Sequence, residues 1–552
     1  MSKRLAITIS GAVSLGSFEG GVLYEILNAI GQHNSNPATP SADKICVDVI
    51  TGASAGGMTA TIAAQKLLYE RGALDGAYSN AFYRPWVSDV SMSGLLNLGS
   101  SEKTDQSILS SNFVADISRQ YLTARYGSHA DVPRNPHPAI NTDQGSPEKN
   151  LKLRLGLAMS NLNGVDYGRP MKPSGKFVYT KHQDQLTTWF DVIEPAAAAD
   201  DKFEFWDPLR NAAVSCGAFP FAFRLVDVTR HDFEYKNDFL ASKIMPAQSF
   251  TYTDGGVFQN EPLGMAKSLV DQIDEHQDTD NRHYLYVSPD NRDSTAVDGD
   301  RFNSGNANFK GTALRLVGAI FSQARFQDWI TADEINRQVK IFNESARGLQ
   351  AVLSKDPGLA VSMKTVAGDL LPRLIPDAAA RDKARERLKK QFGEEYKGLP
   401  DAAKDVWIDS ILVLETSAQL ADSDEMDIYS VTANPSELAS ADLVHFAGFF
   451  DRSYREHDYD VGRDKARKFL SQPVFGLSTP IQYKSEDLRP IDAKLNGLTV
   501  DRMDPWVKTI FRDRLRDRAK ELMKEAGLNL IVRDGIDLFV IKKQLDDLLK
   551  IS

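Results

Sequence analysis

Two segments near the start of the chain repeat one pattern, and no other feature of the sequence constrains the fold as strongly. Each begins with a short apolar run, at residues 5–9 and 45–50, and continues through a loop of small residues into a stretch with the apolar spacing of a helix. Strands that alternate with helices build a mainly parallel sheet covered on both faces. The loops after such strands lie at the carboxyl edge of the sheet, where α/β folds bind their ligands.

Later apolar runs extend this α/β region to about residue 290. They are short enough to be strands, and they lie at residues 153–159, 176–179, 249–253 and 283–287. Beyond about residue 300 the pattern is predominantly helical, and the charge-dense stretch 377–397 is typical of a solvated helix face. A chain of 552 residues exceeds the usual size of one hydrophobic core. We therefore expect an α/β domain over 1–295 and a mainly helical region over 296–552, packed on or beside it.

The composition is that of an ordinary globular protein, with 42% hydrophobic and 25% charged residues. A formal net charge of −10 argues against a broad surface for nucleic acid. The two cysteines, Cys46 and Cys216, indicate neither a disulfide framework nor a zinc site, and they fit a cytoplasmic protein with reduced thiols. Glycines interrupt the apolar run at the N-terminus, which therefore reads as a strand, a loop and a helix rather than as a signal segment.

Any membrane contact is expected to be peripheral, because no stretch approaches the roughly 20 apolar residues of a membrane-spanning helix. A helical pattern over 505–526 suits peripheral contact, since basic residues interleave with an apolar face. That face consists of Val507, Phe511, Leu515, Leu522 and Ala526. Acidic residues in the same segment weaken this interpretation, and packing of the face on the protein's own core is the alternative.

The strongest local signal is a serine between an apolar run and a helix. Residues 52–57 read Gly-Ala-Ser-Ala-Gly-Gly, which contains the pattern G-x-S-x-G. A nucleophilic serine on a sharp strand-to-helix turn needs small neighbours, and Gly52 and Gly56 meet that need. The N–H group of Ala55 and the positive end of the helix dipole favour a developing oxyanion. The pattern indicates Ser54 as a nucleophile, with a plain βα turn as the alternative.

A second loop of small residues, Ser-Gly-Ala-Val-Ser-Leu-Gly at 10–16, also joins a strand to a helix. Such a loop presents successive backbone N–H groups to an anion. A nucleotide-binding P-loop would require Lys-Ser or Lys-Thr after the last glycine, and this chain has Ser17 and Phe18. An oxyanion hole needs only backbone donors, although an ordinary helix-entry turn is the alternative. Four residues are candidate donors: Gly11, Ala12, Val13 and Ser14.

The third signal is Thr-Asp-Gly-Gly at 253–256, directly after a strand-like run. An aspartate at a strand end, before two glycines, can reach into a site above the sheet. Asp-Gly by itself is an ordinary turn signal. A role for Asp254 therefore depends on its combination with the other two motifs.

In this order, the three motifs resemble the patatin-like phospholipase family, in which a glycine-rich oxyanion loop, a G-x-S-x-G turn and a late D-G-G or D-G-A motif build a Ser-Asp dyad. The resemblance extends to Asn-Leu-Asn-Gly at 161–164 and to residues 209–220, and it covers roughly residues 4–290. It implies a three-layer α/β sandwich with a mainly parallel central sheet, followed by a largely helical C-terminal region. It also makes 1–295 the catalytic domain.

Carried over to this chain, the resemblance implies that Ser54 is the nucleophile and Asp254 its base, with no metal or cofactor. Residues 11–14 and the N–H group of Ala55 would form the oxyanion hole. The implied activity is hydrolysis of lipid or other acyl esters through a covalent acyl-enzyme, as in a phospholipase A or a lysophospholipase. A carboxylate is a weak base at its ordinary pKa of about 3.9, so burial is expected to raise the pKa of Asp254. Four glycines would support the turns: Gly52, Gly56, Gly255 and Gly256.

The chain departs from the family in the oxyanion loop. Where the family commonly has three glycines and then Lys or Arg, this chain has Gly-Ala-Val-Ser-Leu at 11–15. The backbone donors remain, but the positive charge near a lipid head group does not. This variant resembles a bacterial subgroup of the family, and the segments 448–450 and 455–463 resemble a C-terminal motif of its large bacterial members. For 455–463 the alternative is a structural helix whose arginines pair with local aspartates.

Two other functions remain open. One is an esterase with a Ser-His-Asp triad of the α/β-hydrolase type, in which the histidine comes last in the chain. The other is a catalytically silent lipid-binding or scaffold protein, against which the intact serine and aspartate motifs argue. The histidines that follow Asp254, none in a small-residue loop after a clear strand, are His276, His283, His445 and His457.

Overall fold

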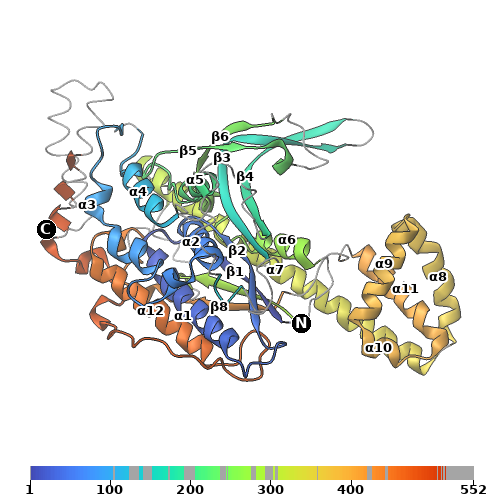
Figure 1. The fold of residues 1–552 in the computed structure, drawn as a ribbon. Helices are drawn as coiled ribbons and strands as arrows, with labels where there is room; N and C mark the ends of the chain where they lie inside the picture. The colour runs from blue at the N-terminus through green and yellow to red at the C-terminus, as the bar shows by residue number, and fades with distance from the viewer. Residues whose placement is uncertain are drawn as a thin grey trace, which may run out of the picture. The chain divides into compact units, whose positions relative to one another are not determined.

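The computed structural model describes most of the chain, and Figure 1 shows how its elements are arranged. The described residues are 2–103, 106–122, 136–140, 152–171, 175–191, 206–235, 244, 246–274, 281–291, 303–304, 309–356, 358–418, 420, 426–441, 445–506, 508–510, 512–513 and 516–517. Contacts divide the chain into two compact units. In its described part, the core unit comprises residues 1–269, 283–328 and 428–552, and the helical unit comprises residues 270–282 and 329–427.

One mixed sheet forms the centre of the core unit. Among the described residues its strands lie in the order β5-β6-β3-β2-β1-β7-β8, and β4 pairs with β3. β1 runs parallel to β2, β2 to β3 and β7 to β8, while β4, β5 and β6 add antiparallel pairs beyond β3. The predicted α/β class, with parallel strands at the centre, is confirmed. The bounds are β1 Lys3–Ile9, β2 Ile45–Gly52, β3 Lys152–Pro170, β4 Lys176–Asp191, β5 Val226–Arg230, β6 Gln248–Thr253, β7 Arg282–Ser288 and β8 Ile428–Thr432.

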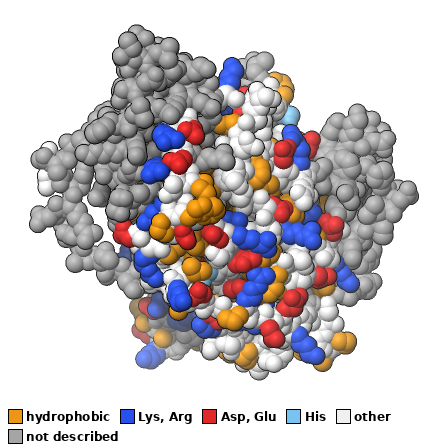
Figure 2. Space-filling view, turned by 90° about the vertical axis from the view of Figure 1, so that its left-hand side faces the viewer, with side chains coloured by type: hydrophobic (Ala, Val, Ile, Leu, Met, Phe, Trp, Pro, Cys, Tyr) orange, Lys and Arg blue, Asp and Glu red, His pale blue; other side chains and the backbone are white. Residues whose placement is uncertain are grey.

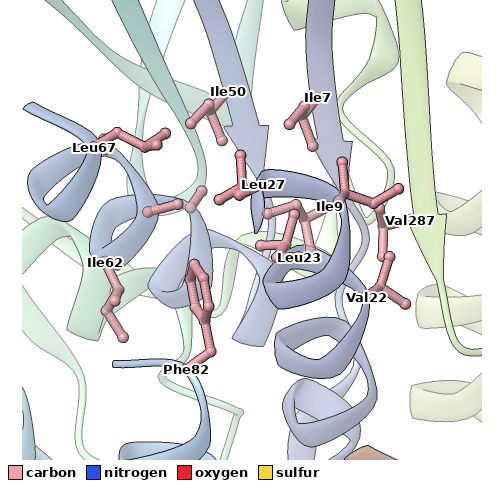
Figure 3. Close-up of a cluster of buried hydrophobic side chains, with 14 of the residues drawn as sticks. Ile7, Ile9, Val22, Leu23, Leu27, Ile50, Ile62, Leu67, Phe82 and Val287 are labelled. Carbon is pink, nitrogen blue, oxygen red and sulfur yellow. The ribbon is translucent and has the colours of Figure 1, made fainter. Parts of the chain in front are cut away.

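Side chains alternate along the strands, and one face of the sheet packs on α1 (Gly16–Ser35) and α2 (Ala55–Tyr69). Ile7 and Ile50 point to this face, where Leu23 of α1 and Leu67 of α2 meet them (Figure 3). Each such aliphatic side chain contributes roughly 1.5–3 kcal/mol when it is fully buried. This apolar layer explains why the two early strands and the helices that follow them form together.

The opposite face of the sheet carries smaller and more polar side chains, and α6 (Leu263–Asp274) packs on it. The hydroxyls of Thr8 and Thr51 lie 3.1 Å apart, and Thr51 also donates to the carbonyl of Pro262, just before α6. A Cβ at Gly156 of β3 would lie 3.1 Å from Leu269 of α6. Helices therefore cover both faces, which gives the three layers predicted from the sequence.

Further helices complete the core unit around the sheet. They are α3 Met92–Leu95, α4 Ser111–Leu122, α5 Trp206–Cys216 and α12 Arg452–Leu470, and α7 (Phe309–Lys355) begins in this unit. Although α12 lies more than 400 residues after α1 in the chain, the two helices lie side by side (Figure 1). At their contact, a Cβ at Gly21 would overlap the carbonyl of Tyr459, and one at Gly462 would overlap that of Phe18. Only glycine at these positions allows so close an approach of two helix backbones.

A buried ion pair also joins α12 to α1. Arg463 Nε lies 2.8 Å from Glu25 Oε1, and both side chains are fully buried. Glu25 Oε1 lies 3.0 Å from Arg467 Nε as well, so one carboxylate accepts from two guanidinium groups. The arginines of this helix thus bind a glutamate of the first helix, whereas Asp460 lies farther from Arg463, at 3.8 Å.

The helical unit has its own small core. It holds the later part of α7 with α8 (Leu359–Leu374), α9 (Ala378–Gln391), α10 (Gly393–Lys397) and α11 (Asp401–Ser417). Trp407 is fully buried there and donates its indole N–H to the carbonyl of Ala346 at 2.9 Å. The charge-dense stretch 377–397 forms α9 and α10, and of α9 only Leu388 is buried. The interpretation of that stretch as a solvated helix face is confirmed.

The division expected at residue 295 stays a prediction about where the catalytic region ends. When the chain is divided by its contacts, residues from 428 onward belong to the core unit again, and they supply β8 and α12. No helix among the described residues is long and apolar enough to cross a membrane. The apolar face predicted within 505–526 lies outside the described residues.

Candidate active site

Ser54 occupies a strained turn between β2 and α2. Its φ is 51° and its ψ is −127°, a conformation that costs a residue other than glycine about 1–3 kcal/mol. The strand and helix backbones approach so closely that a Cβ at Gly52 would overlap the carbonyl of Gly56, and one at Gly56 would overlap that of Ser10. The small residues of the motif therefore allow a sharp turn, as the sequence predicted, with the Ser54 side chain at its apex.

Asp254 lies at the end of β6 and faces Ser54. Ser54 Oγ donates to Asp254 Oδ2 at 2.6 Å, although 200 residues separate the two in the chain. The other oxygen, Oδ1, accepts the N–H of Gly256 at 2.7 Å, which orients the carboxylate as the N-cap of the short helix η7 (Gly255–Val257). The backbone N–H of Asp254 donates to the carbonyl of Ala218 at 2.9 Å. Two hydrogen bonds thus hold the carboxylate, and a third fixes the backbone of Asp254.

Burial raises the pKa of Asp254 to about 7, because the fully enclosed carboxylate loses its hydration. The hydrogen bonds from Ser54 and Gly256 act in the opposite direction and are the smaller effect. A carboxylate with a pKa near 7 can take up and release a proton at neutral pH. The rise expected from the sequence is therefore found.

Cys216 lies beneath the turn rather than in it. A Cβ at Gly57 would overlap its Sγ atom, and the thiol donates to the carbonyl of Ala158 at 3.0 Å. Burial is the larger cause of the raised pKa of this thiol, and the negative charge of Asp254 raises it further. The thiol is therefore a packing group without nucleophilic character.

The loop 10–16 supplies fewer free donors than its length suggests. The N–H of Gly11 donates to the carbonyl of Asn260 at 3.0 Å, and that of Ser14 to the carbonyl of His445 at 3.1 Å. Three of the five expected oxyanion donors, the N–H groups of Ala12, Val13 and Ala55, have no acceptor among the described residues.

The loop is nevertheless close to the serine. A Cβ at Gly11 would lie 3.0 Å from the Cβ of Ser54, so only glycine leaves room there. Val13 adopts a φ of 52°, which is rare for a β-branched residue and marks a backbone that its surroundings hold in place.

Asn260 is a site residue that motif analysis missed. Its side chain donates to the carbonyl of Gly11 at 3.4 Å, and its own carbonyl accepts the N–H of Gly11. It also lies against Gly256, where a Cβ would overlap its Oδ1 atom. Asn260 thus joins the aspartate turn to the loop 10–16. Its place six residues after Asp254 is the one signal in the sequence, and it became informative only through the contacts.

An apolar cavity begins at Ser54 and Asp254. Its volume is about 90 Å³. A water-sized group takes about 10–15 Å³ on the same scale, so the cavity has room for several methylene groups. Its described lining contains no Lys, Arg or His side chain. The lining residues are Val13, Ser54, Ala55, Met58, Ile62, Pro85, Trp86, Val90, Leu95, Val114, Ile117, Ser118, Tyr121, Leu122, Ala213, Val214, Gly217, Phe219, Phe223, Asp254 and Phe449.

The other predicted segments lie near the site in different ways. Residues 209–220 form most of α5 and the turn after it, and they supply four lining residues of the cavity. The segment 161–164 forms a bulge in β3, where Asn161 Oδ1 accepts the N–H groups of Asn163 and Gly164. The described residues include no group of His, Cys, Asp and Glu side chains placed to hold a metal ion.

The histidines considered for a triad make their contacts elsewhere. The ring of His283 packs edge-on against Tyr429, and His457 Nε2 lies 3.0 Å from the carbonyl of Glu437. His445 contacts the loop 10–16 through its carbonyl oxygen. His276 lies outside the described residues. The hydrogen bond of Ser54 goes to Asp254, and no described histidine lines the cavity.

One family model matches the part of the chain that carries these motifs. Residues 7–267 match the family model described as patatin-like phospholipase, and this range includes the loop 10–16, the turn of Ser54 and Asp254. No curated protein matches the chain. The family indicates hydrolysis of lipid acyl groups in general. Over residues 7–267, just under half of its length, the chain is similar to the patatin-like phospholipase family.

Proposed function

We propose that this protein is a serine lipid acyl hydrolase in which Ser54 is the nucleophile and Asp254 the general base. The observation that carries the proposal is the 2.6 Å hydrogen bond from Ser54 Oγ to the buried carboxylate of Asp254. A strained serine at a helix N-terminus beside a carboxylate with a pKa near 7 suits acyl transfer through a covalent intermediate.

In the first step, Asp254 Oδ2 takes the hydroxyl proton while Ser54 Oγ attacks the ester carbonyl carbon. The carbonyl oxygen becomes an oxyanion, which the free N–H groups of Ala12, Val13 and Ala55 are available to bind. When the tetrahedral intermediate collapses, Asp254 returns the proton to the leaving alkoxide. The alcohol departs, and the acyl group stays on Ser54 as an ester.

In the second step, Asp254 takes a proton from a water molecule, and the hydroxide attacks the acyl-enzyme carbonyl. Collapse of the second intermediate breaks the bond to Ser54 Oγ, which recovers its proton from Asp254. The products are one alcohol and one fatty acid, and the two residues return to their starting protonation states.

The cavity supports an acyl chain as the part of the substrate that is bound. Its lining is almost entirely apolar, so it suits methylene groups and not a charged head group. Since no basic side chain is found in the described lining, an anionic head group gains no ion pair there. We therefore infer activity of the phospholipase A or lysophospholipase type that discriminates by acyl chain. The two free cysteines fit an enzyme of the cytosol.

A fluorophosphonate probe tests the proposal directly. The wild-type protein should be labelled stoichiometrically on the peptide that contains Ser54, and Ser54→Ala should lose both the label and lipid hydrolysis. Ser10→Ala is the matched control, because Ser10 is a buried serine of the neighbouring loop whose hydroxyl has no partner among the described residues. Hydrolysis that persists in a folded Ser54→Ala protein would refute the assignment.

A further inference from the structure

The loop 10–16 is held by a segment far outside the family match. We name residues 445–449 the clamp segment. The backbone N–H of Ser14 donates to the carbonyl of His445 at 3.1 Å, and Ser14 Oγ donates to the same carbonyl. The N–H of Gly448 in turn donates to Ser14 Oγ at 3.2 Å. Since Ser14 is fully buried, these bonds form away from water and fix the loop directly after Val13.

The clamp segment itself is tightly constrained. His445 adopts a φ of 65°, a strained conformation for this residue. A Cβ at Gly448 would lie 2.7 Å from Ser14 Oγ and 2.5 Å from the hydroxyl oxygen of Ser440, so only glycine fits between the two serines. Strain of this kind persists only where the surroundings define one conformation.

The same segment forms part of the cavity wall. Phe449 lines the cavity together with Val13 and is almost fully buried. Phe446 packs edge-on against Phe449 with ring centroids 5.8 Å apart, and against Phe219, another lining residue, at 5.3 Å. The clamp segment thus contacts both the proposed oxyanion loop and the proposed site of the acyl chain.

Arg455 of α12 ties the clamp segment to another wall of the cavity. Its side chain is almost fully buried and donates to the carbonyl of Gly448 at 2.7 Å and to that of Val87 at 3.1 Å. Val87 belongs to the π-helix η3 (Arg84–Asp89), whose Pro85 and Trp86 line the cavity. A third bond goes to the carbonyl of Asp451 at 3.1 Å.

The planar, forked guanidinium group is needed for this arrangement. It directs several N–H groups to separate carbonyls at once, which a lysine ammonium on a flexible stem does not reproduce. Burial lowers the pKa of Arg455 to about 10, which still leaves the side chain charged at neutral pH.

We infer that the clamp segment and Arg455 complete the active site. In this inference Ser14 and Arg455 are positioning residues, which hold the N–H groups of Ala12 and Val13 and the wall around Trp86. Phe449 is a specificity-determining residue for the acyl chain. The inference rests on the proposed function of Ser54 and Asp254, and it gives a role to the motif at 448–463, which lies beyond the family match of 7–267.

The first test measures how Ser14 acts. Ser14→Ala removes the two bonds of the hydroxyl and keeps the backbone bond to His445. On p-nitrophenyl butyrate, kcat should fall at least tenfold while KM stays within threefold, because oxyanion donors act mainly in the transition state. Arg455→Lys should likewise lower kcat at least tenfold while KM stays within threefold. Ser10→Ala, a change of equal size in the same loop, should keep both constants within twofold.

The second test measures acyl-chain preference, which a purely structural role would not move. Phe449→Ala should raise the ratio of kcat/KM for p-nitrophenyl dodecanoate to kcat/KM for p-nitrophenyl butyrate at least tenfold. The reason is that removal of the ring enlarges the cavity for a longer acyl chain. Phe449→Leu should restore most of the wild-type profile. The neighbouring Phe450, which does not line the cavity, provides the control variant Phe450→Ala with an unchanged profile.

The outcomes separate the two proposals. If Ser14→Ala keeps its kcat, or if Phe449→Ala keeps the wild-type chain-length profile, the clamp inference is overturned, whereas probe labelling of Ser54 in the same samples leaves the proposed function standing. If the wild-type protein is not labelled at Ser54, the proposed function itself fails. If Arg455→Lys does not fold, the Phe449 variants still test whether the clamp segment forms part of the active site.

Discussion

At the residue scale, the proposed role of Asp254 as general base predicts how activity depends on pH. Its pKa is about 7, and only the ionised carboxylate can accept the proton of Ser54. We expect kcat/KM to rise about tenfold per pH unit below pH 7 and to level off above it. Asp254→Asn should lose about 10²- to 10⁴-fold above pH 7, and the loss relative to wild type should shrink as the pH falls and the wild-type carboxylate is protonated. A wild-type profile that is flat from pH 5 to 8, measured with a neutral ester, would contradict this role.

The same carboxylate should affect the pH dependence of stability. Because its pKa is raised on folding, the folded state binds the proton more tightly than the unfolded state does. Its contribution to stability is fully present below about pH 4 and is lost as the pH rises through about 7. The Asp254→Asn variant has no carboxyl group to ionise at this position, so its stability does not fall in this way as the pH rises. The Tm of the variant minus the Tm of wild type should therefore be larger at pH 8 than at pH 4. The difference amounts to a few kcal/mol at most, and equal Tm differences at both pH values would count against the raised pKa.

Individual residues were predictable where a short motif fixes the local backbone. Ser54 and Asp254 each follow a strand within a few small residues, and their facing positions follow from the family's motif order. Asn260 and the clamp segment were not predictable as site residues. Their contacts with Gly11 and Ser14 depend on how distant segments pack, which no local pattern encodes.

At the scale of elements, the crossing of α1 and α12 depends on two glycines. Gly462→Ala would place a methyl group on the carbonyl of Phe18, and overpacking of this kind typically costs about 1–3 kcal/mol. Gly348→Ala is the control, since its Cβ would meet nothing within 4 Å and alanine favours the helix by about 1 kcal/mol. Urea denaturation should show the first variant destabilised and the second not. Equal stability of Gly462→Ala and wild type would mean that the helices can move apart at no cost.

Long, regular elements were predicted better than short ones. The apolar runs that follow the α/β pattern became β1, β2, β3, β6 and β7, and the run at 176–179 is the start of the longer β4. β5 and β8 were missed. Each has five residues, and β8 pairs with β7 across more than 100 residues of intervening chain, so its sequence alone gives little sign of the sheet.

At the scale of the whole molecule, the helical unit should be separable from the chemistry. Trp407→Ala empties the centre of its small core, a change that typically costs about 3–5 kcal/mol. Hydrogen exchange should then show lost protection within residues 329–427. The exchange rates of β1 and β2, and the rate of probe labelling at Ser54, should stay within twofold of wild type. Labelling that falls together with protection would show that the helical unit supports the site.

Charge is distributed as the composition suggests. On the face drawn in Figure 2, acidic and basic side chains are interspersed among the described residues, without one broad area of positive charge. This arrangement agrees with the expectation that the protein has no nucleic-acid partner, which remains a prediction. The boundary at residue 295 could not be refined from sequence, because a change from mixed to helical pattern does not reveal that β8 and α12 return to the sheet and to α1.

The late position of the clamp segment and α12 has a consequence for synthesis. The ribosome makes Ser54 long before Arg463, which follows 409 residues later. At about 5–20 residues per second, a nascent chain spends roughly 20–80 seconds with its serine made but with neither the clamp segment nor the second helix of the α1–α12 pair in place. During that time the loop after β1 lacks the partners that hold Ser14. If the clamp segment completes the active site as inferred, the proposed hydrolase becomes competent only after residue 463 has been made. Chains released before that point are then expected to be inactive.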